Sequence, residues 1–195
     1  MNKRALLLGG LIVLAALVRL LPHMQNLAPV TALAVFAAIR YRSLWPALVV
    51  PLLAYLLGDL LIELQYRTGN NLQPGIHKGM WVTYVILALA ALMSRLVHGT
   101  RSPLTIGAVT LSSACMYFLM SNFAVWAGGR LYPLTAQGLA SCYVAAIPFF
   151  RNSLLGDIGY GGALFAIWAL AEAFFPVLRE TPAPVPAAPE LVRQS

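Results

Sequence analysis

Long apolar runs alternate with short polar segments along most of the chain. A helix needs about 20 apolar residues to cross the hydrocarbon core of a bilayer. Most of the runs approach that length, and two are clearly shorter. The pattern predicts an all-α polytopic membrane protein with about six transmembrane helices, at residues 5–21, 27–39, 43–62, 80–97, 104–127 and 152–175. A further short apolar segment, residues 138–150, precedes the last span.

The polar segments fix how these elements are connected. Residues 63–79 form the longest connection and contain Asn, Pro and Gly, which favour a loop. The C-terminal residues alternate Pro with Ala, a composition that cannot bury apolar area. We therefore predict a single transmembrane domain over residues 1–178 and a disordered Pro/Ala-rich tail over residues 179–195.

Composition supports lipid as the main solvent of the chain. Hydrophobic residues make up 60% and charged residues 10% of the sequence, whereas soluble domains carry about 25% charged residues. The net charge of +7 comes from Lys and Arg placed singly or in pairs between apolar runs, so we expect no nucleic-acid partner. Their distribution favours cytoplasmic N- and C-termini of a multi-pass protein, which we expect in a cell inner membrane.

Charged side chains inside spans are the first candidates for function, because each costs roughly 2.5–3.5 kcal/mol at a helix centre. Asp59, Asn122 and Asp157 are predicted at one depth, near the outer ends of their spans. They form either a polar ligand pocket open to the outside or an interfacial set wetted by headgroups. Trp81 and Trp126 lie near the same level, as stacking walls of that pocket or as interfacial anchors.

Two intramembrane aspartates, each preceded by Gly, also fit an aspartyl hydrolase, in which two carboxylates share a proton. The sequence has no other catalytic motif, no nucleotide-binding glycine loop and no metal-ligand spacing. We therefore expect a non-enzymatic protein with no catalytic residue, no metal and no cofactor. Any ATP-driven step requires a partner subunit.

The two halves of the chain share short motifs. Leu-Leu-Gly-Asp occurs at 56–59 and again at 154–157, and Pro-x-Thr-Ala occurs at 29–32 and again at 133–136. Transport folds often contain internal repeats. Leu, Ala and Gly are abundant here, so chance remains the alternative to duplication.

The most specific pattern lies in residues 112–160, which contain Ser112-Ser113, Tyr117-Phe118, Asn122-Phe123, Val125-Trp126, Tyr132-Pro133, Cys142-Tyr143, Ala145-Ala146-Ile147-Pro148 and Leu154-Leu155-Gly156-Asp157. The first half adds Arg19-Leu20-Leu21-Pro22-His23 and Asn26-Leu27-Ala28-Pro29-Val30. Over residues 19–175 the chain resembles a bacterial family of uncharacterised small six-span membrane proteins. That family is distantly similar to the substrate-binding (S) components of energy-coupling-factor vitamin transporters.

The resemblance implies an S-component-like bundle with an outward-open pocket, a transmembrane coupling subunit and an ATPase. Ala34 and Ala38 are the nearest match to the small-x-x-x-small motif with which such components dock their partner. We expect a component for uptake of a small vitamin-like or metabolite ligand, with Asp59, Asn122, Asp157, Trp81 and Trp126 binding it, and membrane lipids as further partners. The alternatives are a membrane scaffold or assembly subunit and an intramembrane aspartyl hydrolase.

Overall fold

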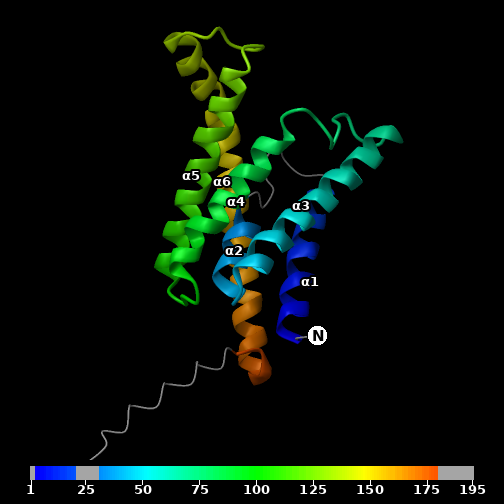
Figure 1. The fold of residues 1–195 in the computed structure, drawn as a ribbon, viewed down its shortest axis with the longest axis vertical. Coiled ribbons are helices and arrows are strands. Elements are labelled where there is room, and N and C mark those ends of the chain that lie inside the picture. The colour runs from blue at the N-terminus through cyan, green and yellow to red at the C-terminus, as the bar shows by residue number, and fades with distance from the viewer. Residues whose placement is uncertain (1–2, 21–30, 180–195) are drawn as a thin grey trace, which may run out of the picture.

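The computed structural model describes residues 3–20 and 31–179, which form helices and no strand. Figure 1 shows them as a bundle of long, tilted helices around one short central helix. In chain order the elements are α1 (Lys3–Leu17), η1 (Val18–Leu20), α2 (Ala32–Arg40), α3 (Leu44–Arg67), α4 (Met80–Ser94), η2 (Arg95–Val97), α5 (Pro103–Ala127), α6 (Ala136–Phe174) and η3 (Pro176–Leu178).

Four helical stretches of the described residues are long and apolar enough to cross a membrane: Leu44–Arg67, Met80–Val97, Pro103–Ala127 and Ala136–Phe174. Only 22% to 33% of each apolar window is buried within the protein. The remaining apolar surface requires lipid, so the chain has the character of a membrane protein. The six predicted spans become four by this measure, because α1 has 15 residues and α2 has nine.

The predicted break between residues 138–150 and 152–175 is absent, because both segments belong to α6. This helix has 39 residues, and at a rise of 1.5 Å per residue it is about 58 Å long. The polar pair Arg151 and Asn152 does not interrupt it, since the Arg151 side chain is exposed. Pro148 lies inside the helix, where it removes one backbone donor. With α5, α6 forms a hairpin that extends past the other helices (Figure 1).

The short helix α2 is the centre of the bundle. All nine of its residues are buried, and it contacts α1, α3, α4, α5 and α6. Its Phe36 ring packs edge-on against Phe165, with ring centroids 5.1 Å apart, and against Trp168 at 6.4 Å. A nine-residue helix that touches five others sets their relative positions, including those that line the cavity described below.

Side chains from other helices cap both ends of α2. At its N-terminus Asp157 of α6 accepts hydrogen bonds from the backbone N–H groups of Thr31 (2.8 Å) and Ala32 (2.9 Å) and from the Thr31 hydroxyl (2.8 Å). At its C-terminus Arg95 donates to the carbonyls of Ala38 (3.2 Å) and Tyr41 (2.5 Å). The carboxylate and the guanidinium pair with backbone N–H and C=O groups that a helix leaves unpaired at its ends. Each charge also interacts favourably with the helix macrodipole.

The first and last described residues lie at the same end of the bundle, which we call the basic end. Arg4 donates to the Leu178 carbonyl (2.7 Å) and to the Arg40 carbonyl (2.9 Å), which ties α1 to η3 and to the end of α2. Burial raises the pKa of Tyr41 to about 12, so this phenol stays neutral and donates to the Ala5 carbonyl (3.3 Å). The predicted tail beyond residue 179 lies outside the described residues.

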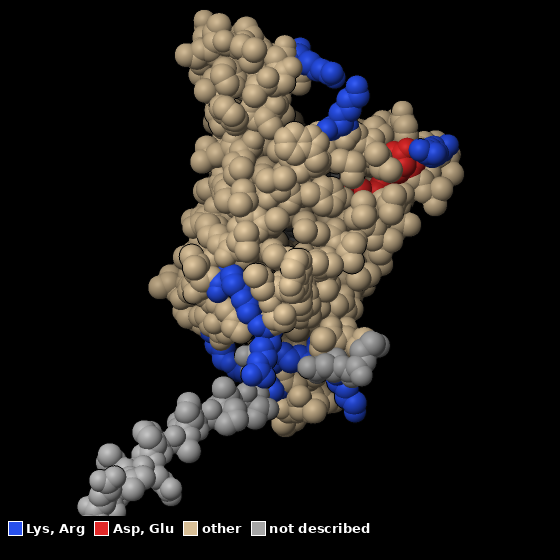
Figure 2. Space-filling model, viewed as in Figure 1, with Lys and Arg blue, Asp and Glu red and all other residues tan. Residues whose placement is uncertain are grey.

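Charged side chains gather at the two ends of the molecule. Figure 2 shows Lys and Arg clustered at the basic end, with further charges at the opposite end and an almost uncharged surface between. The opposite end, which we call the loop end, carries the connections at residues 68–79 and 128–135. Such a band of uncharged surface between charged ends is typical of a membrane protein.

The repeated motifs occupy related places in the fold. The Thr-Ala pair of each Pro-x-Thr-Ala motif begins a helix: Thr31 and Thr135 are the N-cap residues of α2 and α6. The Leu-Leu-Gly-Asp motifs lie in α3 and α6. In the first half, residues 41–43 separate α2 from α3, whereas α6 runs through the corresponding region without a turn.

Candidate functional site

A cavity of about 520 Å³ opens between four helices in the half of the bundle nearer the loop end. Its walls come from α3, α4, α5 and α6, and part of the connection between α3 and α4 lies over it. The lining residues are Tyr55, Asp59, Ile62, Asn71, Gln73, Pro74, Gly75, His77, Thr83, Ala114, Tyr117, Phe118, Ser121, Asn122, Ala146, Phe149, Phe150, Ser153 and Asp157. The cavity therefore combines polar groups with aromatic rings.

The connection over the cavity is fixed to α3 by a glycine and a glutamate. A Cβ atom on Gly75 would lie 1.9 Å from the Asp59 carbonyl oxygen and 2.6 Å from the Glu63 nitrogen. Only glycine permits this approach of the two backbones. Glu63 accepts a hydrogen bond from the Ile76 N–H (3.2 Å) and pairs with Arg67 (2.8 Å). These contacts hold residues 73–77 at the rim of the cavity.

Asp59 supplies a buried carboxylate on the α3 wall. Asp59 is only 5% exposed. The Tyr84 hydroxyl of α4 donates a hydrogen bond to Asp59 Oδ2 (2.6 Å). The Tyr84 ring packs edge-on against Tyr55, with ring centroids 5.8 Å apart. A carboxylate with aromatic neighbours in a mostly apolar bundle is a strong acceptor for a cationic or N–H donor.

Asp157 lines the opposite wall of the cavity, but its carboxylate binds the start of α2. Both of its oxygens accept hydrogen bonds from the start of α2, and the residue is 1% exposed. These three bonds use most of the lone-pair positions of a carboxylate. Asp157 therefore positions α2 beneath the cavity, and Asp59 is the carboxylate better placed to meet a ligand.

The α5 wall carries further polar and aromatic groups. The Asn122 amide donates to the Phe118 carbonyl (2.8 Å), which directs the side chain along its own helix. The Tyr117 hydroxyl lies 3.3 Å from the Thr83 hydroxyl of α4. The Phe118 ring packs at a tilt against the Phe150 ring of α6, with ring centroids 4.6 Å apart. Hydroxyls thus join α4 to α5, and rings join α5 to α6.

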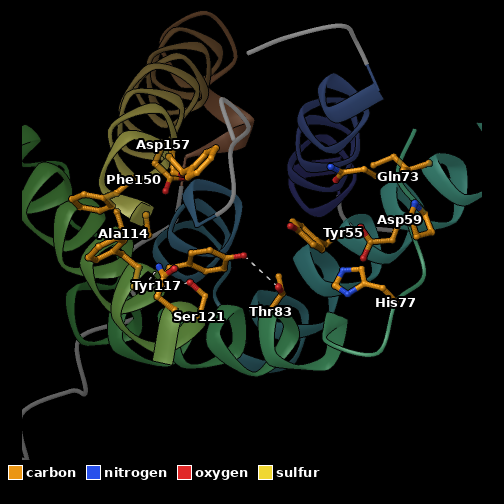
Figure 3. Close-up of a pocket in the computed structure, with 18 of the residues that line it drawn as sticks. Tyr55, Asp59, Gln73, His77, Thr83, Ala114, Tyr117, Ser121, Phe150 and Asp157 are labelled. Carbon is orange, nitrogen blue, oxygen red and sulfur yellow. Dashed lines mark hydrogen bonds between the residues drawn. The ribbon is translucent and has the colours of Figure 1, made fainter. Parts of the chain in front are cut away.

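Figure 3 shows how the two carboxylates lie. Asp59, with Tyr55 and Gln73, is on one side of the cavity, and Asp157, with Phe150, is on the other. The two aspartates each bond to a different neighbour, Tyr84 and Thr31. The cavity therefore contains two carboxylates on separate walls.

The structure brings together three of the five residues predicted to bind a ligand. Asp59, Asn122 and Asp157 line the same cavity. Trp81 and Trp126 do not line it. Trp81 is 64% exposed and borders an apolar groove on the outside of α4 and α5. The Trp126 indole donates to the Pro133 carbonyl (3.0 Å) and so faces the turn after α5.

The aromatic walls of the cavity are other residues, which the sequence interpretation missed: Tyr55, Tyr117, Phe118, Phe149 and Phe150. One signal was available. Tyr normally concentrates at the membrane interfaces, whereas Tyr55 and Tyr117 lie well inside α3 and α5. A tyrosine away from an interface needs a partner for its hydroxyl, and this need favours a polar interior.

Comparison with known proteins gives one match. Residues 1–178 match a family model described as a family of unknown function (DUF6580). No curated protein matches the chain, and no solved structure matches it.

Proposed function

This chain belongs to DUF6580, a family of unknown function, and we propose that it is a substrate-binding component for uptake of a small vitamin-like or metabolite ligand. The observation that carries the proposal is the cavity of about 520 Å³, where Asp59 and Asn122 lie among aromatic rings. Ligand sites usually have volumes of roughly 300–1,000 Å³ and apolar walls with a few placed polar groups. The cavity fits this description.

The lining residues favour a particular chemistry in the ligand. Tyr55, Tyr117 and Phe150 offer flat surfaces for a ring or another apolar body. Asp59 offers a carboxylate to a cationic group or to N–H and O–H donors, and Tyr84 holds that carboxylate in place. The ligand we propose therefore has a planar or apolar body and at least one strong hydrogen-bond donor.

In the proposed arrangement the protein is a six-pass, S-component-like bundle in a bacterial inner membrane. The four long helices are joined by α1 and α2 as shorter passages. The hydrogen bond from Arg4 to Leu178 supports this arrangement, because it places both ends of the bundle sequence on one side. The basic end faces the cytoplasm, following the positive-inside rule, and the cavity opens outward. A transmembrane coupling subunit and an ATPase complete the transporter, since the sequence has no nucleotide-binding motif.

Orientation can be tested by thiol labelling in intact cells. In a chain with Cys115 and Cys142 replaced by Ala, we expect Asn70→Cys to react with a membrane-impermeant maleimide. Asn70 is exposed in the connection between α3 and α4. Ala187→Cys is expected to react only after the membrane is permeabilised. Labelling of Ala187→Cys from outside would reverse the proposed orientation.

The alternatives draw on other features of the site. The hydrogen bonds from Asp157 to the start of α2 stabilise the fold without any ligand, so a scaffold subunit would also have them. An aspartyl hydrolase requires two carboxylates close enough to share a proton. The positions of Asp59 and Asp157 on opposite sides of the cavity favour a binding site over that chemistry (Figure 3).

The binding proposal is tested by native mass spectrometry of the protein purified in mild detergent. We expect a bound small molecule in the wild-type protein and at least tenfold less in Asp59→Asn. Loss of one charged hydrogen bond costs about 1.5–3 kcal/mol, which corresponds to roughly tenfold or more in affinity. In Asn122→Ala we expect about two- to tenfold less, because Asn122 is neutral and a neutral hydrogen bond contributes about 0.5–1.5 kcal/mol.

Ser112→Ala is the matched control, because Ser112 lies on the same helix as Asn122 but does not line the cavity. Its hydroxyl donates to the Ala108 carbonyl of that helix (2.9 Å). It should retain the bound molecule. Equal occupancy in all variants, or no bound molecule after purification from several growth media, would favour the scaffold alternative.

A further inference from the structure

A second groove, also of about 520 Å³, runs along the outside of α5 and α6. It begins deep in the bundle at Asp157 and reaches the basic end at Arg101 and Glu172. Its floor is formed mainly by small and apolar side chains, which include Ile106, Gly107, Ile158, Gly161, Gly162, Phe165, Ala166 and Ala169. The groove and the ligand cavity share one lining residue, Asp157.

The dimensions of the groove match the depth of one membrane leaflet. Along α6 it extends from Asp157 to Glu172, which at 1.5 Å per residue is about 22 Å. One leaflet with its headgroup region is half of a bilayer about 40–45 Å thick, or about 20–22 Å. The groove is open beside two of its glycines: a Cβ atom on Gly107 or Gly162 would meet no other atom within 4 Å.

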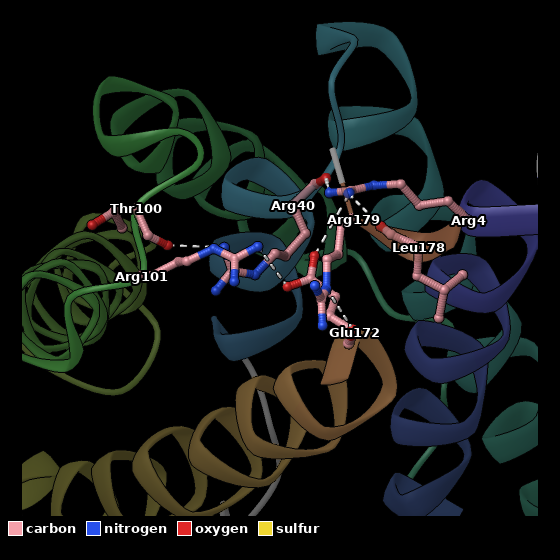
Figure 4. Close-up of polar contacts among 7 residues, drawn as sticks. All are labelled: Arg4, Arg40, Thr100, Arg101, Glu172, Leu178 and Arg179. Carbon is pink, nitrogen blue, oxygen red and sulfur yellow. Dashed lines mark hydrogen bonds and ion pairs between the residues drawn. The ribbon is translucent and has the colours of Figure 1, made fainter. Parts of the chain in front are cut away.

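Arginines surround the basic end of this groove (Figure 4). Arg101 is 66% exposed at its side chain and pairs with Glu172 (2.9 Å). Arg40 is 8% exposed and donates to the Thr100 carbonyl (2.8 Å). Arg4 lies 3.6 Å from the same glutamate, and Arg179 donates to the Glu172 backbone carbonyl (2.9 Å). Arg4 and Arg101 thus face the Glu172 carboxylate, and Arg40 and Arg179 of the same cluster bond to backbone carbonyls beside it.

We propose that the groove binds one anionic phospholipid. Its phosphate lies at Arg101, with the charge of Arg40 behind it, and an acyl chain follows the apolar floor toward Ile158. Basic pockets between helices at a membrane surface recognise anionic headgroups, and Arg binds phosphate oxygens through two parallel N–H donors. Glu172 holds Arg101 at the mouth of the groove. The apolar floor selects a lipid over free phosphate.

The test uses the full-length protein, delipidated in a neutral detergent, with phosphatidylglycerol, phosphatidylcholine or inorganic phosphate added. Native mass spectrometry counts bound lipid, and thermal unfolding reports stabilisation. We expect phosphatidylglycerol to bind at least tenfold more tightly than phosphatidylcholine and to raise Tm, and inorganic phosphate to leave Tm unchanged. Arg101→Gln should remove the preference for phosphatidylglycerol, whereas Arg130→Gln at the loop end should keep it.

Two glycines of α6 give a matched pair for the acyl chain. Gly162→Leu fills the groove, whereas Gly159→Leu places the same side chain on the same helix outside it; a Cβ atom at either position meets nothing within 4 Å. We expect tenfold weaker phosphatidylglycerol binding in Gly162→Leu only, with Tm of the lipid-free protein unchanged in both. Equal binding by the two variants, equal affinity for the two lipids, or the same Tm increase with inorganic phosphate would each overturn the proposal. If Gly162→Leu unfolds, Gly107→Leu on α5 replaces it.

Discussion

Replacing Asp157 by alanine is expected to lower the free energy of unfolding by about 3–5 kcal/mol, the range for breaking a buried charged hydrogen-bond network. The change removes three hydrogen bonds at the start of α2. It leaves the N–H groups of Thr31 and Ala32 without this acceptor, in residues that are almost fully buried. It also removes the negative charge that opposes the positive end of the α2 macrodipole.

Thermal or denaturant unfolding of the purified protein in detergent measures this loss. Asp157→Asn is expected to lie between wild type and alanine, because an amide offers one acceptor oxygen where the carboxylate offers two. Asp59→Asn is the matched comparison, since Asp59 ends the other Leu-Leu-Gly-Asp motif and also lines the cavity. We expect that change to cost less than about 1 kcal/mol, because Tyr84 can still donate to the amide oxygen. Equal losses for the two asparagine variants would contradict the capping role of Asp157.

Hydropathy was sufficient to locate the long regular helices. The predicted spans 43–62, 80–97 and 104–127 correspond closely to Leu44–Arg67, Met80–Val97 and Pro103–Ala127. Each of these runs is uniformly apolar, so its length alone identifies a helix that can cross a membrane. The rule failed at Arg151 and Asn152, where a polar pair resembled a boundary. There α6 simply continues, since nothing in the pair prevents helical backbone geometry.

Helical register located part of the site, because it gives the depth of each residue along its helix. Asp59, Asn122 and Asp157 were placed at a similar depth, and they line one cavity. Depth does not give the rotation of a helix about its axis, which packing against neighbours decides. Trp81 and Trp126 had suitable depths and face elsewhere.

Long-range polar contacts were beyond the reach of sequence patterns. Thr31 and Asp157 are 126 residues apart, and no spacing rule connects them. Asp157 therefore looked like a ligand group equivalent to Asp59, although its oxygens bond to the start of α2. The distinction matters for function, because a variant at Asp157 can abolish binding simply by disturbing α2.

Gly75→Ala is expected to widen the opening of the cavity. The added Cβ atom would lie 1.9 Å from the Asp59 carbonyl oxygen and 2.6 Å from the Glu63 nitrogen. Both atoms belong to the backbone of α3 and cannot move aside as a side chain would. Overpacking of this kind costs about 1–3 kcal/mol, so the segment around Gly75 should leave α3 and lose the hydrogen bond from the Ile76 N–H to Glu63.

Thiol reactivity inside the cavity reports this opening without knowledge of the ligand. In a chain lacking Cys115 and Cys142, Ser153→Cys places a single thiol on the α6 wall. We expect Gly75→Ala to increase its rate of maleimide labelling about tenfold, since about 1.4 kcal/mol changes an equilibrium by that factor. Gly79→Ala is the control, because a Cβ atom there would lie 3.5 Å from His77, an ordinary contact. Equal labelling rates in the two variants would show that the contact of Gly75 with α3 does not control access. A faster rate in Gly75→Ala alone would identify residues 73–77 as a partial cover of the cavity, and Gly75 as the residue that holds this cover against α3.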